Sequence, residues 1–248
     1  LVSVLMTSYN TSSYVKHSIE SVLAQSYKNL EIIIVDDNSA DDTSNLIKET
    51  AAKDRRVKFF TNKTNLGAFA SKTLALKHTK GEFIVCHDSD DFAHCEWIER
   101  QIKPLLENSK FIASVSHWVK IDDNGVFYTR NIYPLLRRHV TSLMFKRAVL
   151  DKIGAWDIVR TGADSEFYKR LRIVFGKRSI KDIKLPLVIG AYRENSLTAS
   201  PHSGYTSPAR LAYVESYSRW HIECLKKGKK PIMTTDKRPF SVHREMVS

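Results

Sequence analysis

The sequence predicts an α/β fold, a single domain with a mixed central sheet covered by helices, and three observations support this. The chain has 248 residues, 42% of them hydrophobic, which is enough for one large domain with a real core. About the first 100 residues alternate short apolar runs with segments of helical spacing, the pattern of a parallel sheet with helical crossovers. Polar and acidic residues follow three of these runs, and ligands of open α/β sheets bind at the carboxyl ends of the strands.

In the first half of the chain, each expected strand is a buried apolar run. These runs lie at residues 2–6, 30–35, 57–60 and 81–86. The expected helices lie between and after them, at residues 15–23, in a segment capped at 39–42 that runs through residue 47, and at residues 67–78 and 97–106. Pro104 falls inside the last segment, and because proline disrupts a helix interior we expect a break there.

The second half has a mixed pattern. Residues 111–119 and 126–133 flank Asp122-Asp123-Asn124-Gly125, a turn sequence typical of a β-hairpin. The remaining expected elements are, in order, a strand at 140–145, a short helix closed by Gly154, a helix at 163–174, a strand at 183–192 and an amphipathic helix at 209–225. A loop rich in Ser, Thr, Pro and His precedes this last helix, and a basic tail follows it.

The composition narrows the range of partners. The net charge of +12 predicts an anionic partner, either nucleic acid, an acidic membrane surface, or a phosphorylated or acidic polymer. Much of the basic excess lies after residue 225, where a solvated tail is the alternative explanation. No run approaches the roughly 18 apolar residues of a membrane-spanning helix, and the start does not resemble a secretion signal. Three irregularly spaced cysteines do not predict a disulfide framework, so we expect a cytoplasmic protein.

Three of the expected strands end in polar and acidic residues. The three stretches are Thr7-Ser8-Tyr9-Asn10, Asp36-Asp37-Asn38-Ser39 and Asp88-Ser89-Asp90-Asp91. Because the carboxyl ends of parallel strands meet at one edge of a sheet, these side chains are expected to converge. The crowded carboxylates of the third stretch repel one another unless a hard cation such as Mg²⁺ or Mn²⁺ lies between them. The alternative is a solvated acidic turn that caps the next helix.

Glycine-rich phosphate loops are absent from the sequence. Neither GxGxxG nor GxxxxGK[ST] occurs, which argues against a dinucleotide enzyme or a P-loop NTPase. If a nucleotide diphosphate binds at the predicted edge of the sheet, a metal ion and basic side chains must neutralise it.

The order and spacing of these motifs resemble the family 2 glycosyltransferases of the GT-A fold. The matching segments, spread over about residues 1–200, are "VSVLMTSYN", "EIIIVDDNSADDT", "NLGAF", "GEFIVCHDSDDF" and "TGADSEFYKRL". The resemblance implies metal-dependent transfer of a sugar, with inversion, from a nucleotide diphosphate donor, most often UDP, to a glycan or glycolipid acceptor in bacterial surface polysaccharide synthesis. It also implies a domain at 1–205, with a nucleotide-sugar half (1–100) and an acceptor half (101–205), followed by a C-terminal helix and basic tail (206–248).

The resemblance implies nucleotide-binding roles for residues at the strand ends. Thr7 and Tyr9 would lie against the base or ribose, and Asp37 would hydrogen-bond the base. Lys72 falls near a position where such enzymes often place a phosphate-binding arginine.

The segment Asp88-Ser89-Asp90 matches the DxD motif of the family. In that motif Asp88 would approach the ribose, and Asp90 would bind Mn²⁺ or Mg²⁺. Asp91 can share either task, and which of Asp90 and Asp91 is the main metal ligand stays open.

The catalytic base is expected to be Asp164. An inverting single displacement needs a base on the face opposite the leaving group, and in "GADSEF" Asp164 matches the catalytic carboxylate of the family. The alternative is an acid that merely interacts with a helix N-terminus, and Glu166 is the rival base.

The chain departs from the family pattern after the last core strand, where many relatives carry a histidine. Here Arg193 occupies the matching stretch, and we expect it to contact the diphosphate. His202 is the nearest imidazole; we favour a solvated loop histidine, with a metal ligand as the alternative. The QxxRW motif of processive synthases is also absent, so transfer of one or a few sugars is expected.

Two other functions remain as alternatives. A sugar-phosphate nucleotidyltransferase would share the fold but usually has a glycine-rich, basic signature where this chain has "TSYNTSSY". A basic nucleic-acid-binding domain is supported only by aromatic residues among Lys and Arg in the last 40 residues, and the acidic strand ends oppose it. We therefore expect no nucleic acid partner. The amphipathic helix at 209–225 and its basic tail instead predict peripheral contact with an anionic acceptor or membrane at the inner leaflet.

Overall fold

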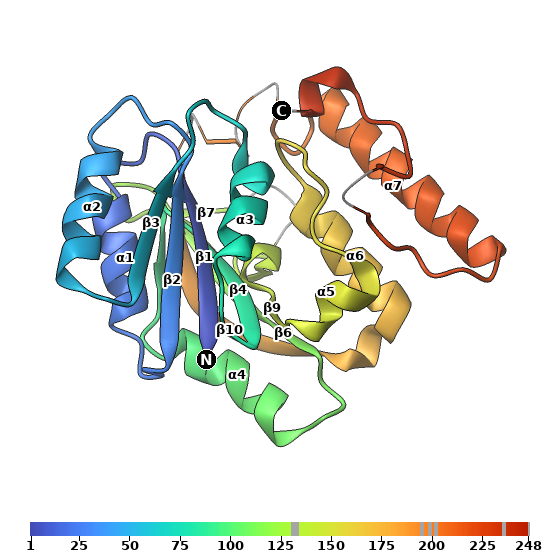
Figure 1. Cartoon of the computed structure of the whole chain (residues 1–248), viewed down its shortest axis with the longest axis horizontal. Coiled ribbons are helices and arrows are strands. Elements are labelled where there is room, and N and C mark those ends of the chain that lie inside the picture. Colours follow the sequence, from blue (N-terminus) through green and yellow to red (C-terminus); the bar gives the residue numbers. More distant parts are fainter. Residues whose placement is uncertain (130–133, 194–195, 198–199, 201–202, 235–236, 248) are drawn as a thin grey trace.

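The computed structural model describes residues 1–129, 134–193, 196–197, 200, 203–234 and 237–247 of the chain. Over these residues a ten-stranded mixed sheet forms the middle layer, with helices on both of its faces (Figure 1). The strands are β1 (Val2–Ser8), β2 (Leu30–Asp36), β3 (Val57–Thr61), β4 (Phe83–Asp88), β5 (Asp91–Ala93), β6 (Ala113–Ile121), β7 (Phe127–Tyr128), β8 (Arg137–Arg138), β9 (Met144–Lys146) and β10 (Ile180–Ala191).

Both faces of β1, β2 and β4 are buried, which explains the unbroken apolar runs of the sequence. Along β2, Ile32 and Ile34 pack on one face and Ile33 and Val35 on the other, as the strand period of two requires. The first face is covered by α1 (Val15–Leu23), α2 (Thr43–Lys53) and α4 (Trp97–Glu107). The second is covered by α3 (Ala68–Lys77), α5 (Ala148–Ile153), α6 (Ala163–Phe175) and α7 (Pro208–Lys226).

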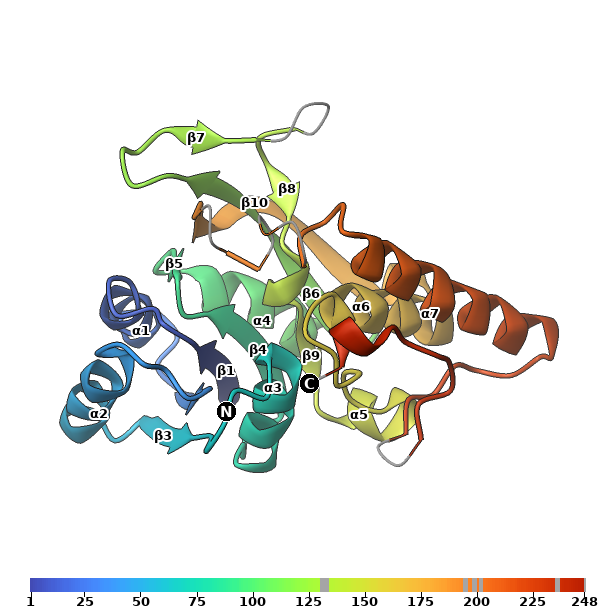
Figure 2. The same ribbon diagram turned by 90° about the horizontal axis from the view of Figure 1, so that it is seen from above.

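The sheet has a parallel first half and a mixed second half, as predicted. Its strand order is β3-β2-β1-β4-β9-β6-β10-β5, and the strands from β3 to β4 are parallel. The strand β9 is antiparallel to β4 and to β6, whereas β6 and β10 are parallel to each other. The short strands β7 and β8 pair with β6 and project beyond the helical layers (Figure 2).

The connection from β4 to β5 closes a curl in this sheet. Only Ser89 and Asp90 separate the two strands in the chain, yet three strands stand between them in the sheet order. The strands from β9 to β10 must therefore bend round until β5, on the far edge, meets the end of β4. Asp88-Ser89-Asp90-Asp91, the acidic segment, lies at this seam, where both halves of the domain meet.

Two expectations for local structure were wrong, and two short strands were missed. Residues 140–145 were expected as one strand, but the structure has a 3₁₀ turn, η1 (Val140–Ser142), before β9. The helix α4 runs through Pro104 without a break, because the proline lies in its last turn and costs little more than one hydrogen bond there. The strands β5 and β8 were not predicted, since two or three residues carry no periodicity. The division at 205 and 206 stays a prediction.

Candidate functional site

The ends of β1, β2 and β4 lie side by side, so the predicted polar edge forms. The register of β1 pairs Ser8 with Asp36 on one side and Thr7 with Asp88 on the other. The turns that follow β1 and β2 are tied together, because Asn10 Oδ1 accepts a hydrogen bond from the Ala40 N–H at 2.9 Å. Asn10 has a φ of 49°, a left-handed conformation that asparagine tolerates better than most residues.

Asp37 anchors the loop that leads into α3. Its Oδ1 accepts hydrogen bonds from the Asn62 side-chain amide at 2.7 Å and from the Leu66 N–H at 2.9 Å. Its Oδ2 accepts from the Gly67 N–H at 2.8 Å. A carboxylate accepts about four hydrogen bonds, so the contacts in the described part of the chain leave room for one donor from a ligand. Its predicted contact with the base stays a prediction.

Lys72 and Asp88 form an ion pair between α3 and the end of β4. Lys72 Nζ lies 3.3 Å from Asp88 Oδ1, and the lysine side chain is only 5% exposed. Burial opposes the lysine charge, but Asp88, Cys86 and Asp164 outweigh it and raise the pKa of Lys72. Burial likewise opposes ionisation of Asp88, and the charge of Lys72 outweighs it, so the pKa of Asp88 lies below its ordinary value. Both groups are therefore charged at neutral pH.

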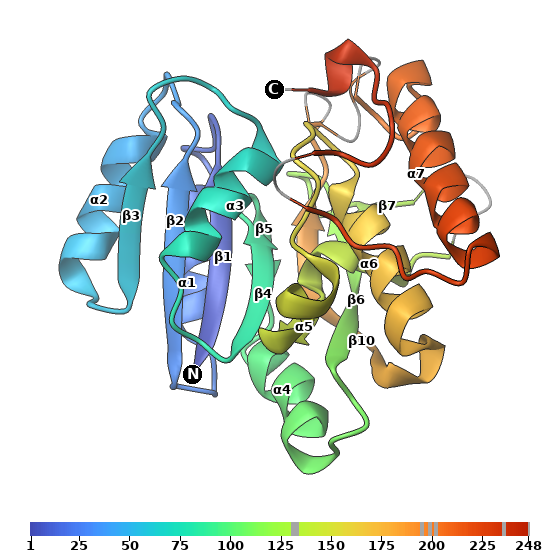
Figure 3. The ribbon, with the colours of Figure 1, turned by 45° about the vertical axis from the view of Figure 1, so that its right-hand side comes forward.

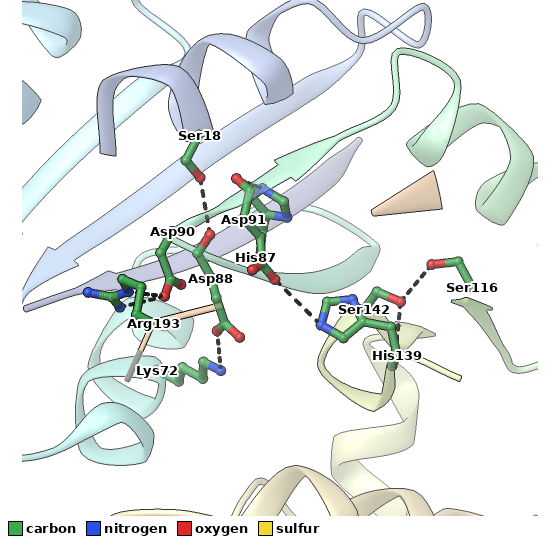
Figure 4. A network of polar contacts seen from close by, with 10 residues as sticks. All are labelled: Ser18, Lys72, His87, Asp88, Asp90, Asp91, Ser116, His139, Ser142 and Arg193. Atoms are coloured by element: carbon green, nitrogen blue, oxygen red, sulfur yellow. Dashed lines mark hydrogen bonds and ion pairs between the residues drawn. The ribbon is translucent and has the colours of Figure 1, made fainter. Parts of the chain in front are cut away.

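Asp90 is held by Arg193, so a predicted metal ligand contacts a residue that is predicted to bind the diphosphate. Arg193 Nε donates to Asp90 Oδ2 at 3.0 Å, and Arg193 Nη2 donates to the same oxygen (Figure 4). The guanidinium also lies over the Tyr14 ring, 5.3 Å from its centroid. The Tyr14 hydroxyl in turn donates to Asp123 at 3.0 Å, which links this pair to the β6–β7 turn.

Asp88 and Asp91 form a three-residue group with His139. One ligand atom of each residue lies within 4.8 Å of those of the other two. His139 Nε2 is 3.6 Å from Asp91 Oδ2, and the histidine ring stacks on Trp118 with the planes 7° apart. Figure 4 shows the His139 ring directed at Asp91, with Asp88 beside it.

Asp91 and His139 contribute polar atoms to this group that are buried and unsatisfied. Within the described residues, Asp91 Oδ2 and both ring nitrogens of His139 are buried without a hydrogen-bond partner. Burial lowers the pKa of His139 to about 3, so the ring is neutral and offers a lone pair. Burial, and then the charges of Asp90 and Asp88, raise the pKa of Asp91 well above its ordinary value. A divalent cation would satisfy Asp91 Oδ2 and one ring nitrogen of His139 and would relieve the repulsion between Asp91 and Asp88, so these residues fit a metal ion of the Mg²⁺ or Mn²⁺ type.

Two residues of this region were missed from the sequence. His139 follows two arginines with no spacing that marks a ligand, and Lys120 lies one residue before the end of β6. Lys120 is 9% exposed, and burial lowers its pKa even though Asp91, Asp90 and Asp88 oppose the change. Only the curl of the sheet brings both residues to the acidic segment, so no local signal could have identified them.

Asp164 lies in the first turn of α6 and lines a pocket between the two halves of the domain. Lys72 and Cys86 line the same pocket from α3 and β4, and Thr141 lines it from η1. Asp164 is half-buried, and its Oδ1 accepts a hydrogen bond from the Ser165 N–H at 2.7 Å. Lys72 also pairs with Asp88, and the charge of Asp164 acts on the same ammonium group, so the predicted base lies near the acidic segment.

The other predicted site residues have simpler surroundings. Thr7 is half-buried next to Asp88, and Tyr9 is 50% exposed just beyond the end of β1. Glu166, the rival base, is fully buried beside Arg170 and is thus closed to an acceptor. His202 lies outside the described residues, so its predicted role is untested.

A comparison with protein families matches residues 3–167 to the model described as "Glycosyl transferase family 2". An uncharacterized glycosyltransferase of Methanocaldococcus jannaschii is 41% identical over 187 residues, covering 68% of this chain and 64% of that protein. WfgD of Escherichia coli, a UDP-Glc:alpha-D-GlcNAc-diphosphoundecaprenol beta-1,3-glucosyltransferase, is 40% identical over 109 residues, covering 44% of this chain and 42% of the relative. The matches thus span from 18% to 64% of the length of the curated relatives.

Solved structures of glycosyltransferases share the fold. Staphylococcus aureus TarS in complex with UDP-GlcNAc aligns with a TM-score of 0.67 and 21% identity, covering 86% of this chain and 64% of that chain. A mannosyltransferase of Pyrobaculum calidifontis, in complex with GDP-Man and Mn²⁺, aligns with a TM-score of 0.61 and 19% identity, covering 93% of this chain and 65% of that one. At these identities the likeness shows the GT-A fold alone, which confirms the predicted fold class.

Proposed function

The chain belongs to glycosyl transferase family 2. From that premise we propose that it transfers the sugar of a UDP-sugar donor to a glycan or glycolipid acceptor, with inversion at the anomeric carbon. The observation that carries the proposal is the position of Lys72. Its ammonium pairs with Asp88 of the DxD motif and lines the same pocket as Asp164. The group that would hold the donor and the group that would take the acceptor proton therefore both lie close enough to one buried cation to raise its pKa.

UDP is the proposed nucleotide because two similar proteins use or bind it. WfgD is named for its UDP-Glc donor, and TarS was solved with UDP-GlcNAc. The Pyrobaculum neighbour was solved with GDP-Man, so the fold itself accommodates either base. In this chain Asp37 is proposed to accept the remaining hydrogen bond from the base, and Thr7 and Tyr9 are proposed to lie against the base or ribose.

We propose that Asp88, Asp91 and His139 hold a divalent cation, with Asp90 joining once it leaves Arg193. When bound, the cation would neutralise charge on the departing diphosphate. The chain supplies three further cations near the acidic segment, Lys72, Lys120 and Arg193, and we assign diphosphate contacts to them.

The proposed reaction is a single displacement. The Asp164 carboxylate accepts the proton of the acceptor hydroxyl while the hydroxyl oxygen forms a bond to the anomeric carbon. The bond between that carbon and the diphosphate oxygen breaks, and the electron pair leaves with UDP. Attack from the face opposite the diphosphate inverts the anomeric configuration.

The acceptor is proposed to be a glycolipid or an anionic glycan at the cytoplasmic face of a membrane. WfgD is named for a diphosphoundecaprenol-linked acceptor, which supports the glycolipid class. Within the described residues, no helix is both long enough and apolar enough to cross a membrane. The outer face of α7 exposes Leu211, Ile222 and Leu225 next to the basic tail, and we propose that this face rests on anionic lipid. Absence of cosedimentation with phosphatidylglycerol vesicles at low salt would count against this contact.

A thermal-shift screen of UDP, GDP and their sugar conjugates, each with and without Mn²⁺, tests the proposal. Metal-dependent stabilisation by one base is expected, and no response to any nucleotide would contradict the proposal. The stabilising nucleotide-sugar should then be turned over with release of UDP. Release of pyrophosphate would instead favour the nucleotidyltransferase alternative. The Asp164→Asn variant should bind the donor normally and lose turnover, and near-normal turnover would reject Asp164 as the base.

A further inference from the structure

We propose that α7 belongs to the catalytic unit and that His221, acting through Glu166 and Arg170, positions Asp164. The inference rests on the proposed role of Asp164 as the base. The family match ends at residue 167, so α7 lies entirely outside the matched segment. In the structure α7 packs along the outer side of α6, the helix whose first turn carries Asp164 (Figure 3).

A buried ion pair fixes the start of α6. The side chains of Glu166 and Arg170 are both 0% exposed, with Arg170 Nε 2.9 Å from Glu166 Oε1. Arg170 Nη2 donates to Glu166 Oε2 at 2.9 Å and to the Ala155 carbonyl at 2.7 Å, and Nη1 donates to the Ile153 carbonyl. The arginine therefore joins the first turn of α6 to the end of α5 and the segment that follows it.

His221 adds a contact from α7 to the same carboxylate. Its Nε2 lies 3.0 Å from Glu166 Oε1, and its side chain is 4% exposed. Glu166 comes two residues after Asp164, so this hydrogen bond holds the helical turn that carries the proposed base. Glu166 Oε1 is shared between Arg170 and His221, and the loss of either partner would leave buried charge less well compensated.

Other residues of α7 form the wall against which α6 begins. Gly162, the residue before α6, has a φ of 85°, and its side-chain position faces Arg210 and Tyr213 of α7 at 3.6 Å. Tyr213 and Tyr217 are buried in the same core as Phe167 of α6. The first turn of α6 is therefore enclosed by α7 as well as hydrogen-bonded to it.

A buried ionic network is a costly way to gain stability, because apolar side chains of similar volume usually do as well or better. Its advantage is directional, since charged hydrogen bonds fix orientation as well as contact. A general base needs such orientation, because it must lie within hydrogen-bonding reach of the acceptor hydroxyl. A fixed first turn of α6 would meet that requirement, and the network would then serve catalysis more than folding.

The test replaces His221 by leucine, which cannot contact Glu166, and by glutamine, whose side-chain amide can still donate to it. Met246→Ala is the control, because it removes a buried side chain from the same core without touching the Glu166 network. Amide hydrogen exchange is measured for the peptide that covers residues 162–168, which leaves out the Arg160 N–H that donates to the Met246 carbonyl. In His221→Leu the exchange should rise about tenfold, and in His221→Gln and Met246→Ala it should stay within about threefold of the wild type.

The same variants are assayed for release of UDP from the nucleotide-sugar that stabilises the wild type. We expect kcat of His221→Leu to fall about tenfold with KM for the donor within about twofold, and glutamine to restore most of the loss. Unchanged exchange in His221→Leu, or an equal rise in Met246→Ala at equal melting temperature, would overturn the proposal. If His221→Leu does not fold, His221→Gln is compared with His221→Asn instead. The shorter asparagine should not reach Glu166 and should therefore show the faster exchange and the lower kcat. A wild type that turns over no nucleotide-sugar would contradict the proposed function, while the exchange data would still decide whether α7 holds the Asp164 turn.

Discussion

Lys72 Nζ lies 3.3 Å from Asp88 Oδ1, and the same side chain lines the pocket of Asp164. A lysine that is 5% exposed keeps its charge only because carboxylates surround it. The pair therefore fixes the protonation of both partners before any ligand arrives. In the proposed reaction Lys72 would face a diphosphate that approaches Asp88, and it would keep its charge while the leaving group gains one.

Replacing this buried ammonium tests its role directly. Lys72→Gln removes the charge and leaves Asp88 without its cation, so the pKa of Asp88 should rise. We expect kcat/KM for the nucleotide-sugar to fall by a factor on the order of 10². Lys77→Gln, on the exposed side of the same helix, is the control and should remain within about twofold of the wild type. Equal losses of kcat/KM in the two variants would show that Lys72 acts only through the net charge of the protein and not through its position beside Asp88.

The group formed by Asp88, Asp91 and His139 predicts how strongly each of three variants lowers the affinity for Mn²⁺. Asp91→Asn should lower Mn²⁺ affinity by a factor on the order of 10², since the buried Asp91 oxygen has no other partner among the described residues. His139→Gln should lower it by about tenfold. Asp90→Asn should have the smallest effect without nucleotide, because Arg193 already occupies that carboxylate. Electron paramagnetic resonance of free Mn²⁺ measures all three, and a larger loss in Asp90→Asn than in Asp91→Asn would assign the main ligand to Asp90 instead.

The acidic residues at the strand ends could be predicted from the sequence, whereas His139 and Lys120, which lie beside them in the structure, could not. Asp37 and Asp88 follow apolar runs that are typical of buried strands. Their place at one edge of the sheet could therefore be predicted from the local hydrophobic pattern. His139 and Lys120 reach the same place through long-range pairing of β6, β9 and β10. The pairing of β5 with β10 is equally remote, because a three-residue strand has no register until its partner exists.

The contact of the C-terminal helix with Glu166 also could not be predicted from the local sequence pattern. The spacing of α7 predicted an amphipathic helix and its place in the chain, and the structure has this helix at Pro208–Lys226. Nothing in that spacing indicated that His221 would meet Glu166, because an imidazole on an apolar helix face is usually an ordinary core residue. The contact depends on how α6 and α7 cross, which only tertiary packing decides.

A carboxylate remote from the site predicts how stability changes with pH. Glu31 is 6% exposed and accepts hydrogen bonds from Ser3 and the Lys80 N–H, with Lys58 Nζ 2.7 Å from its Oε2. Burial opposes ionisation, but these hydrogen bonds outweigh it and lower the pKa of Glu31. The folded-state pKa is thus below the unfolded value of about 4.3, so the stabilisation is complete above that pH and is lost as the pH falls through the folded pKa.

Glu31→Gln should therefore lower the free energy of unfolding at pH 7 by about 1–3 kcal/mol, measured by urea denaturation. The difference from the wild type should shrink as the pH falls below about 4, because the wild-type carboxylate then protonates. Glu49→Gln, an exposed glutamate on α2, should change the stability little at either pH. A difference between wild type and Glu31→Gln that grows toward low pH would contradict the assigned sign.

Arg193 makes the sharpest prediction, because its removal should have two effects of opposite sign. In the unliganded protein Arg193 occupies Asp90, so Arg193→Ala should free that carboxylate and raise Mn²⁺ affinity by a few-fold. In the proposed complex Arg193 contacts the diphosphate, so the same variant should weaken UDP binding in the presence of Mn²⁺ by about tenfold. Titration calorimetry with Mn²⁺ alone and then with UDP measures both, and Arg178→Ala, an exposed arginine on η2 (Lys177–Ser179), is the control. If both affinities fall together, Arg193 holds the acidic segment in place and does not exchange Asp90 for the diphosphate.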